Sequence, residues 1–286
     1  METVQELDSE MTADPHRDAR SRIQPGGYLL ELSLDWIVLR ASENIHHLLR
    51  ESHVTLIDEP LGRFVHSQAL HDLRNLFSRL SGTTGIGRAY DVRLTDEHHL
   101  VDVAFQLVDG RVLLEAVPSS GSFGEYFGTV GGLISGLAHS HGQALLDGAA
   151  RRMRALTGYD RVTLSCGERR SESSRGAFAS AAAHAEFPIM IADSEAEGVR
   201  LFPREIDESS AGAALMHSPD SQQQQKLKDQ GIRALLRVPF SADDETCEFC
   251  CESRTPRDPS FELHAAAELF AQMFALRLEL DEATNH

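Results

Sequence analysis

Short apolar runs separated by polar turns predict several strands in the first part of the chain. Residues 28–32 (YLLEL) and 36–41 (WIVLRA) flank a polar turn, which is typical of two antiparallel strands. Three later segments alternate between apolar and polar residues, as half-buried strands do: 89–94, 99–108 and 111–117. Asp109-Gly110 separates the last two segments, and this dipeptide favours the tight turn of a β-hairpin.

Two helices are predicted between these groups of strands. Ser42 is a favourable N-cap residue for a short helix over 43–51. Apolar residues at helical spacing predict a longer helix over 65–80. Two strands, a helical region and an antiparallel meander follow one another in the order of a PAS-type domain, in which a sheet carries helices on one side.

A small polar segment, residues 119–123, predicts a boundary between two domains. A long helical stretch follows over 124–156, and Gly142 is a candidate break within it. Gly158 stands where glycine commonly ends a helix.

The rest of the chain has the pattern of a second domain with a central antiparallel sheet. A strand is predicted over 161–165, and residues 167–186, rich in Ser, Ala and Glu, are predicted to form a loop. The remaining predicted elements are a helix over 221–229, strands over 232–240 and 246–253, and an amphipathic helix over 259–282. The predicted fold class is therefore α+β, with two domains that each have an antiparallel sheet flanked by helices.

Charge and the N-terminal sequence narrow the function without changing the fold. The 286 residues carry a net charge of −17, which is the wrong sign for binding the phosphates of nucleic acid. No apolar run approaches the ~18 residues of a membrane helix, and the acidic N-terminus lacks the apolar core of a secretion signal. We expect a cytoplasmic protein with neither nucleic acid nor membrane as a partner, in which residues 1–21 form a disordered tail.

Several segments together resemble the PAS–GAF photosensory core of bacterial phytochromes. RIQPGGYLLEL at 22–32 is similar to the I-Q-P-H-G entry and first strand of that family, and VLLEAVP at 112–118 is similar to a later strand. LTGYDRVTL at 156–164 is similar to L-T-G-F-D-R-V-M, and CCESRTPRD at 250–258 lies where the family has C-H-H-x-T-P-R. The likeness implies a PAS-like domain over 22–118 and a GAF domain over 124–282.

The residues that hold the bilin in this family are missing at the matching positions. Bacterial phytochromes attach it through a cysteine upstream of I-Q-P-H-G, and this chain has no cysteine before Cys166. The pocket histidine of S-P-x-H falls at Gln223, and the histidine of C-H-H falls at Glu252 or Ser253. The segment around Asp193 has no D-I-P motif. The resemblance therefore implies a degenerate pocket without a covalent bilin or any other expected cofactor.

The I-Q-P segment has a further implication, because in phytochromes it threads through a lasso of the second domain and forms a knot. The matching lasso segment here, Phe187 to Pro219, is shorter than in the family. We predict that the knot is absent or much reduced. Ile23 to Gly27 would then serve only as a turn before the first strand, with Pro25 fixing φ.

Three cysteines lie close together on one predicted strand. Alternation places Cys247 and Cys251 on one face and Cys250 on the other. Two interpretations remain open. The thiols are small buried apolar side chains, or they form a redox sensor in which Cys166 or a cysteine of a partner chain resolves the oxidised thiol.

Motifs for catalysis and metal binding are absent from the chain. It has no nucleophile elbow, phosphate-binding loop or metalloprotease helix. The histidine pairs 46–47 and 98–99 lack the i, i+4 spacing of helical metal ligands. We predict neither a metal site nor an enzyme.

The preferred hypothesis is a phytochrome-like sensory module that lacks a covalent bilin and regulates an output kinase or another regulator protein. A red/far-red photoreceptor that binds biliverdin non-covalently is the first alternative, and a thiol redox sensor is the second. The resemblance also implies a homodimer, formed through the helices over 124–156 and 259–282. Apolar residues continue to Leu280 near the end of the last helix, as such pairing requires.

Overall fold

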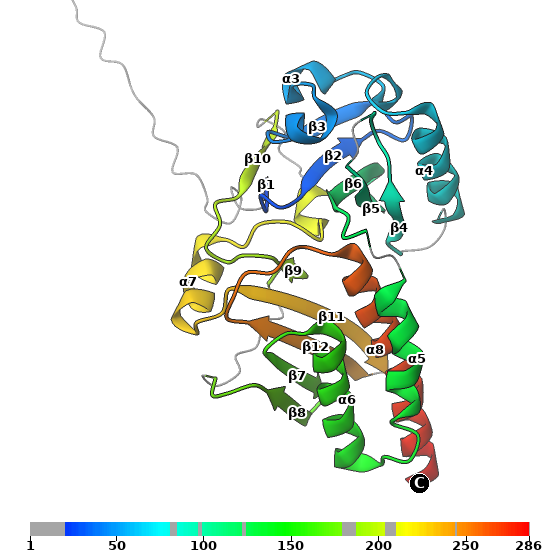
Figure 1. Cartoon of the computed structure of the whole chain (residues 1–286), viewed down its shortest axis with the longest axis vertical. Helices are drawn as coiled ribbons and strands as arrows, with labels where there is room; N and C mark the ends of the chain where they lie inside the picture. The colour runs from blue at the N-terminus through cyan, green and yellow to red at the C-terminus, as the bar shows by residue number, and fades with distance from the viewer. Residues whose placement is uncertain are drawn as a thin grey trace, which may run out of the picture.

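Two antiparallel sheets, one above the other in Figure 1, form the frame of the molecule. The structure is a computed structural model that describes residues 21–80, 85–96, 99–121, 124–178, 187–203, 210–243 and 245–285. Over these residues the first sheet has seven strands, in the order β1 (Arg22–Ile23), β10 (Val199–Phe202), β3 (Val38–Ser42), β2 (Tyr28–Leu32), β6 (Arg111–Pro118), β5 (Val101–Val108) and β4 (Gly87–Val92). Within the same residues the second sheet has five, in the order β8 (Arg169–Ser174), β7 (Arg161–Cys166), β12 (Glu245–Ser253), β11 (Ala234–Ala242) and β9 (Met190–Ile191). Both sheets carry helices, so the predicted α+β class is confirmed; of the predicted tail over 1–21, only Ser21 lies within the described residues.

One face of the first sheet packs against several short helices and one longer helix. These are α2 (His46–Leu49), α3 (His53–Leu56), the 3-10 helix η1 (Leu61–Arg63) and α4 (Ser67–Leu80). Leu30 and Leu114 lie in the buried cluster that the strands share with these helices. Because side chains alternate along a strand, the neighbouring Leu29 and Leu113 pack on the opposite face, in a small cluster with Ile23.

Local signals account for the hairpin of the first sheet but not for its first helix. Asp109 and Gly110 have φ values of 49° and 74°, as the predicted tight turn between β5 and β6 requires. The predicted N-cap at Ser42 is wrong, because α2 begins later, with Ile45 at its N-cap. Ser42 is the last residue of β3 instead, and its hydroxyl oxygen accepts a hydrogen bond from the N–H of Leu29 at 3.2 Å.

One face of the second sheet packs against α5 (Glu125–Ser135), α6 (Gly142–Thr157) and α8 (Phe261–Asn285), as Figure 1 shows. The ring of Phe249 in β12 lies 5.9 Å from that of Phe270 and 5.7 Å from that of Phe274, both in α8. α5 and α6 replace the single predicted helical stretch, and α6 begins at the predicted break, Gly142, whose φ is 52°. Gly158, with a φ of 69°, ends α6 as predicted.

The edge strand β8 corrects the loop prediction for residues 167–186. It pairs with β7 along its whole length. Its sequence, RRSESS, buries only the small side chains of Ser171 and Ser173, so no apolar residue marks it as a strand. The end of the predicted loop, residues 179–186, lies outside the described residues.

The N-terminal segment is held between two parts of the second half of the chain. Arg22 and Ile23 form β1, which pairs with β10 on one side. On the other side Ile23 forms a β-bridge with His217, and the N–H of Ser218 donates to the carbonyl oxygen of Arg22 at 3.0 Å. Ile23 is 0% exposed. The later part of the chain therefore holds this segment from both sides. The absent or much reduced knot stays a prediction, because residues 204–209 of the lasso segment lie outside the described residues.

Gln24 extends this contact through its side chain. The side-chain Nε2 donates to the carbonyl oxygens of Met190 at 2.6 Å and His217 at 3.2 Å. Its Oε1 accepts a hydrogen bond from the N–H of Ala192 at 2.6 Å. Gln24 is 2% exposed, so these bonds form where water does not compete for them.

A buried carboxylate makes a second polar link between the two halves. Glu115 of β6 accepts hydrogen bonds from the N–H groups of Leu215 and Met216, each at 2.8 Å. Burial raises the pKa of Glu115 to about 7, although the two N–H donors favour the charged form. A third link joins the helices to the first sheet, because Arg88 of β4 pairs with Glu268 of α8 at 2.8 Å.

Replacing Gln24 with alanine removes the buried partner of three backbone groups, those of Met190, Ala192 and His217. Each unsatisfied buried group costs about 1–3 kcal/mol, and we expect Gln24→Ala to lower the free energy of unfolding in urea by about 2–4 kcal/mol. Gln222→Ala, on the exposed side of α7 (Ser221–Asp229), is the matched control, with an expected change below about 0.5 kcal/mol. Equal losses in the two variants would contradict the role given to Gln24.

Candidate functional site

The two faces of the second sheet differ in their chemistry. Along β12, every second residue belongs to the buried cluster beneath α5, α6 and α8, as the alternation in the sequence predicts: Cys247, Phe249 and Cys251. The other face, here named the second face, is formed by the residues that alternate with these and by their neighbours in β7 and β11: Arg161, Thr163, Leu235, Arg237, Glu248, Cys250 and Glu252. It therefore includes Glu252, one of the predicted pocket positions.

Two buried ion pairs occupy the second face. Arg161 and Glu252 lie opposite each other on β7 and β12, each is 1% exposed, and Nε of the arginine donates to Oε2 of the glutamate. Arg237 donates through Nε and Nη2 to Glu248 at 2.8 and 2.6 Å. Its Nη1 also donates to the carbonyl oxygen of Phe187 at 2.6 Å. Charges buried to this degree are tolerated only when they are paired and hydrogen-bonded.

Aromatic and aliphatic side chains pack beside these ion pairs. The guanidinium carbons of Arg161 and Arg254 lie 4.6 and 4.0 Å from the centroid of the Phe178 ring. A small buried cluster packs next to Cys250 and contains residues before β9, in β9, in α7 and around the start of β11: Phe187, Ile191, Leu227, Ile232 and Leu235. The protein's own side chains thus occupy the second face.

Gln223, the position matched to a pocket histidine, has a structural role at the start of α7. Its N–H donates to the carboxylate of Asp220 at 2.7 Å, and its Oε1 accepts from the N–H of Asp220 at 3.0 Å. This reciprocal pair is a capping box. The side chain of Gln223 is thereby engaged with the helix terminus.

Two other predicted pocket positions, Asp193 and Ser253, meet at Arg233. The guanidinium donates to both carboxylate oxygens of Asp193, each at 2.8 Å, and this lowers the pKa of that carboxyl. The backbone N–H of Arg233 donates to the carbonyl oxygen of Ser253 at 2.8 Å. The Ser253 hydroxyl lies 3.3 Å from a carboxylate oxygen of Asp160. The structure brings these two positions together through one arginine, whereas Glu252 engages a separate ion pair.

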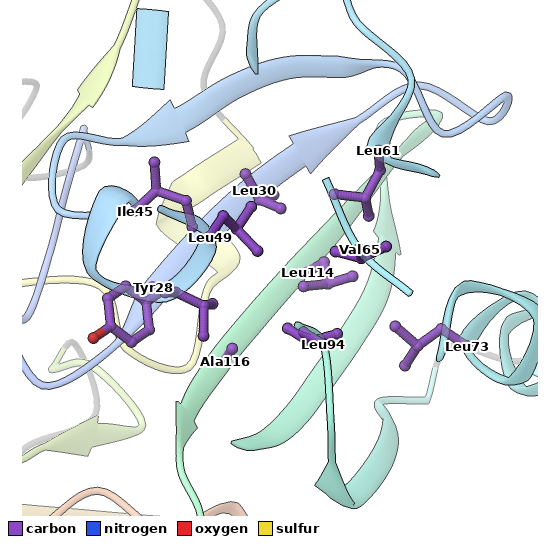
Figure 2. Close-up of a pocket in the computed structure, with 11 residues that line it drawn as sticks. Tyr28, Leu30, Ile45, Leu49, Leu61, Val65, Leu73, Leu94, Leu114 and Ala116 are labelled. Carbon is purple, nitrogen blue, oxygen red and sulfur yellow. The ribbon is translucent and has the colours of Figure 1, made fainter. Parts of the chain in front are cut away.

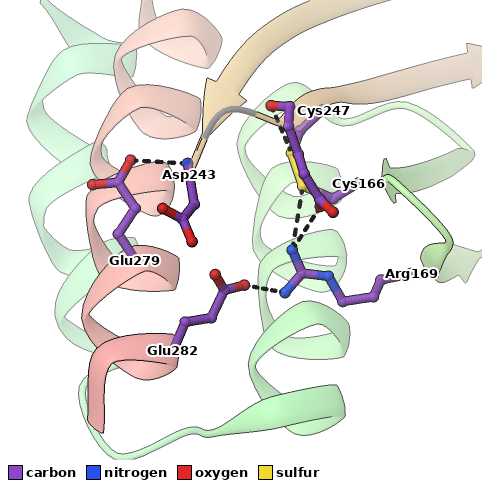
Figure 3. Close-up of a disulfide and its surroundings, with 7 residues drawn as sticks. Cys166, Arg169, Asp243, Cys247, Glu279 and Glu282 are labelled. Carbon is purple, nitrogen blue, oxygen red and sulfur yellow. Dashed lines mark hydrogen bonds and ion pairs between the residues drawn. A yellow bond between two sulfur atoms is a disulfide. The ribbon is translucent and has the colours of Figure 1, made fainter. Parts of the chain in front are cut away.

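Two of the four cysteines form a disulfide between β7 and β12, shown in Figure 3. Cys166 and Cys247 lie opposite each other in the strand register, with their Cα atoms 4.2 Å apart, and both are buried. Arg169 lies beside them: its Nη2 is 3.8 Å from the Cys166 sulfur and 3.0 Å from Glu245. The same guanidinium pairs with Glu282 of α8. The disulfide is thus connected through one arginine to the last helix.

The other two cysteines, Cys250 and Cys251, are free thiols. Burial raises the pKa of both thiols well above the usual range. Because the thiolate is the reactive form, neither residue is activated for oxidation. Among the cysteines proposed for redox chemistry, Cys166 and Cys247 are the pair that the structure brings together.

A small cavity in the first half of the chain is lined only by apolar surface. Figure 2 shows it between Leu30 and Leu114 of the sheet and Ile45, Leu61 and Leu73 of the helical region. Its volume is about 10 Å³, which is near the lower limit for a single water molecule. It has neither the room nor the polar groups for a cofactor.

The described residues contain no group of three or more His, Cys, Asp or Glu side chains that could hold a metal ion. Within the same part of the chain, no helix combines the length and the apolar character needed to cross a membrane.

Three arginines of this region, Arg161, Arg169 and Arg237, are not among the predicted site residues. The sequence does contain a signal for Arg161 and Arg237, because a charged residue within a buried strand requires an opposite charge nearby. Glu248 and Glu252, at alternate positions of β12, supply those charges. Arg169 carries no such signal, because its strand is polar throughout.

The fold is similar to that of solved bacteriophytochrome structures. The chromophore-binding domain of an unusual bacteriophytochrome, RpBphP3 from R. palustris, matches with a TM-score of 0.76 and 21% identity, over 94% of this chain and 98% of that chain. The chromophore-binding domain of a Stigmatella aurantiaca phytochrome matches with a TM-score of 0.73 and 21% identity, over 90% of this chain and 96% of that chain. A longer RpBphP3 structure matches with a TM-score of 0.76 and 20% identity, over 93% of this chain and 59% of that chain. No protein-family model and no curated protein matches the sequence significantly. The chain therefore has the fold of a PAS–GAF chromophore-binding domain.

The disulfide gives a test that separates its two cysteines from the free thiols. It closes a loop with a sequence separation of 81 residues, and disulfides stabilise folded proteins by about 2–4 kcal/mol. We expect reductant to lower the free energy of unfolding of the wild type by about this amount and to leave that of Cys166→Ala unchanged. Cys250→Ala, the control, should respond to reductant as the wild type does. Equal responses of the wild type and Cys166→Ala would show that the disulfide does not form in solution.

Proposed function

We propose that the chain is a phytochrome-like PAS–GAF sensory module that lacks a covalent bilin and regulates an output domain or a protein partner such as a kinase. In this proposal residues 22–118 form the PAS-like domain, residues 124–282 form the GAF domain, and the protein acts in the cytoplasm without enzymatic activity. The fold shared with bacteriophytochrome chromophore-binding domains supports a sensory role. The lack of any cysteine before Cys166 supports the absence of the thioether link used by bacterial phytochromes.

The occupied second face is the observation that carries this proposal. A tetrapyrrole on this face would displace aromatic side chains such as Phe178 and separate Arg161 from Glu252. Leaving one member of a buried ion pair without its partner costs about 3–5 kcal/mol. Bilin contacts would first have to offset that loss, which favours a module that responds to a different signal.

An absorption spectrum tests this proposal. The chain is expressed together with a heme oxygenase, which supplies biliverdin, and the purified protein is compared with protein made without the enzyme. A bacteriophytochrome chromophore-binding domain expressed in the same way is the positive control. We expect no red or far-red band and no change on illumination, since the second face is filled.

A band that photoconverts and is lost on denaturation would support the alternative, a photoreceptor that holds biliverdin non-covalently. The known chromophore-binding domains with this fold are the observation that favours this alternative. A band that remained bound after denaturation would overturn the proposed lack of a covalent link.

We further propose that the protein is a homodimer formed through the helices over 124–156 and 259–282. Three leucines of α8 support this proposal, because they are exposed although they are large and apolar: Leu269 (38%), Leu276 (63%) and Leu280 (64%). Their spacing of seven and then four residues places them on one side of the helix. A second copy of α8 would remove this apolar surface from water.

A charge introduced into this leucine stripe tests the dimer. We expect the double variant Leu276→Glu, Leu280→Glu to shift the protein from dimer to monomer in sedimentation velocity, since two buried carboxylates would face each other across the interface. Leu34→Glu is the matched control, because Leu34 is also exposed (58%) but lies in the turn between β2 and β3. A monomeric wild type, or equal effects of the two changes, would refute this interface.

A thiol redox sensor is the second candidate function, and the Cys166–Cys247 disulfide favours it. A dithiol reductant would convert the S–S bond into two thiols while forming its own disulfide. Arg169, which contacts both Cys166 and Glu282, would pass this change to α8. The same sedimentation measurement, with and without dithiol, tests the idea, and a dimer fraction that does not depend on the redox state would remove it.

A further inference from the structure

A cavity of about 560 Å³ lies outside the second face, at the junction between the two halves of the chain. Its walls come from residues 118–120 at the end of β6 and just beyond it, from Tyr126 in α5, from Tyr159 just after α6, and from the loop 255–260 before α8. Binding cavities for small molecules commonly have volumes of about 300–1,000 Å³. This cavity is therefore large enough for a metabolite, unlike the small apolar cavity of the first half.

Two tyrosine hydroxyls are available in this cavity. Tyr159 is only 4% exposed, yet none of the described residues forms a hydrogen bond with its hydroxyl group. The hydroxyl of Tyr126, a half-buried residue, likewise has no hydrogen-bond partner among the described residues. Burial raises the pKa of both phenols, so each keeps its proton at neutral pH and serves as a hydrogen-bond donor. Neither hydroxyl is among the fully buried polar atoms that lack a partner, so both are open to water or to a ligand in the cavity.

Arg257 brings a positive charge to the same cavity. Its guanidinium carbon lies 4.9 Å from the centroid of the Tyr159 ring. Nη2 donates to the carbonyl oxygen of Gly158 and Nε donates to the hydroxyl of Ser253 at 3.4 Å, which fixes the orientation of the group. Nη1 has no hydrogen-bond partner among the described residues. Asp258, the one acidic residue of the lining, is exposed to solvent.

The remaining lining supplies an apolar surface beside these donors. Pro118, Pro259 and Leu263 contribute most of it, together with the two tyrosine rings. Several short hydroxyl side chains lie between them: Ser119 donates to Asp91, and the Ser260 oxygen accepts from the N–H of Leu263. The donors on which the site is argued are the two phenols and the Arg257 edge.

We propose that this cavity binds a small organic anion, a carboxylate or a phosphate group carried on an apolar body. The anionic group accepts hydrogen bonds from Tyr126, Tyr159 and Arg257, and the apolar body lies against the proline and leucine side chains. Charge-assisted hydrogen bonds of this kind are the strong ones in proteins. The site is independent of the proposed bilin-free state, because it shares no residue with the second face.

Probes that share a phenyl ring but carry opposite charges test this assignment. Benzoate and phenyl phosphate carry the two anionic groups, and benzylammonium carries a positive charge on the same apolar body. Binding to the full chain is measured by isothermal titration calorimetry and by saturation-transfer NMR. We expect one or both anions to bind and benzylammonium not to bind. If benzylammonium binds instead, or neither anion binds at millimolar concentrations, the proposal is overturned.

Conservative variants then locate the site. We expect Tyr126→Phe and Tyr159→Phe each to weaken anion binding about tenfold, which corresponds to 1.4 kcal/mol. Tyr28→Phe, which removes a hydroxyl from a tyrosine beside the small apolar cavity, is the matched control and should bind as the wild type does. Thermal unfolding of each variant verifies that it is folded. If Tyr159→Phe does not fold, Tyr126→Phe alone tests the site. Anion binding that is unchanged in the folded variants would place the bound anion elsewhere and refute this site.

Discussion

The passage of residues 22–24 between two segments of the second half is the contact on which the rest of the structure depends. Ile23 is bordered by β10 on one side and His217 on the other. The side chain of Gln24 bonds to backbone groups of Met190, Ala192 and His217. A buried polar side chain is stable only when its donors and acceptors are satisfied. The relative position of the two sheets is therefore fixed by directional bonds as well as by apolar contact.

The second sheet uses its two faces for different purposes. One face contributes Phe249 and its neighbours to the apolar core beneath the helices, where packing alone determines the residues. The second face carries arginine–glutamate pairs, which are costly to bury and which specify their partners by geometry.

Sequence patterns predict the elements that depend on neighbouring residues. Asp109-Gly110 fixes a hairpin because the turn needs only these two residues, and Gly142 and Gly158 mark helix ends for a similar local reason. The passage of Ile23 could not be predicted in this way, because its partner Val199 is far away in the sequence. Strand β8 could not be predicted because its buried residues are serines. Tyr159 could not be assigned to the cavity because its sequence context is that of an ordinary core residue.

The position of strand β10 determines whether the two halves of this protein can be separated. It belongs by sequence to the second half, yet it lies between β1 and β3 of the first sheet. A gene fragment that ended after β6 would leave β3 as an open sheet edge, which promotes association with other chains. Separation of the chain at the linker would therefore leave an unpaired strand edge in both pieces, so the two halves fold as one unit despite their separate cores.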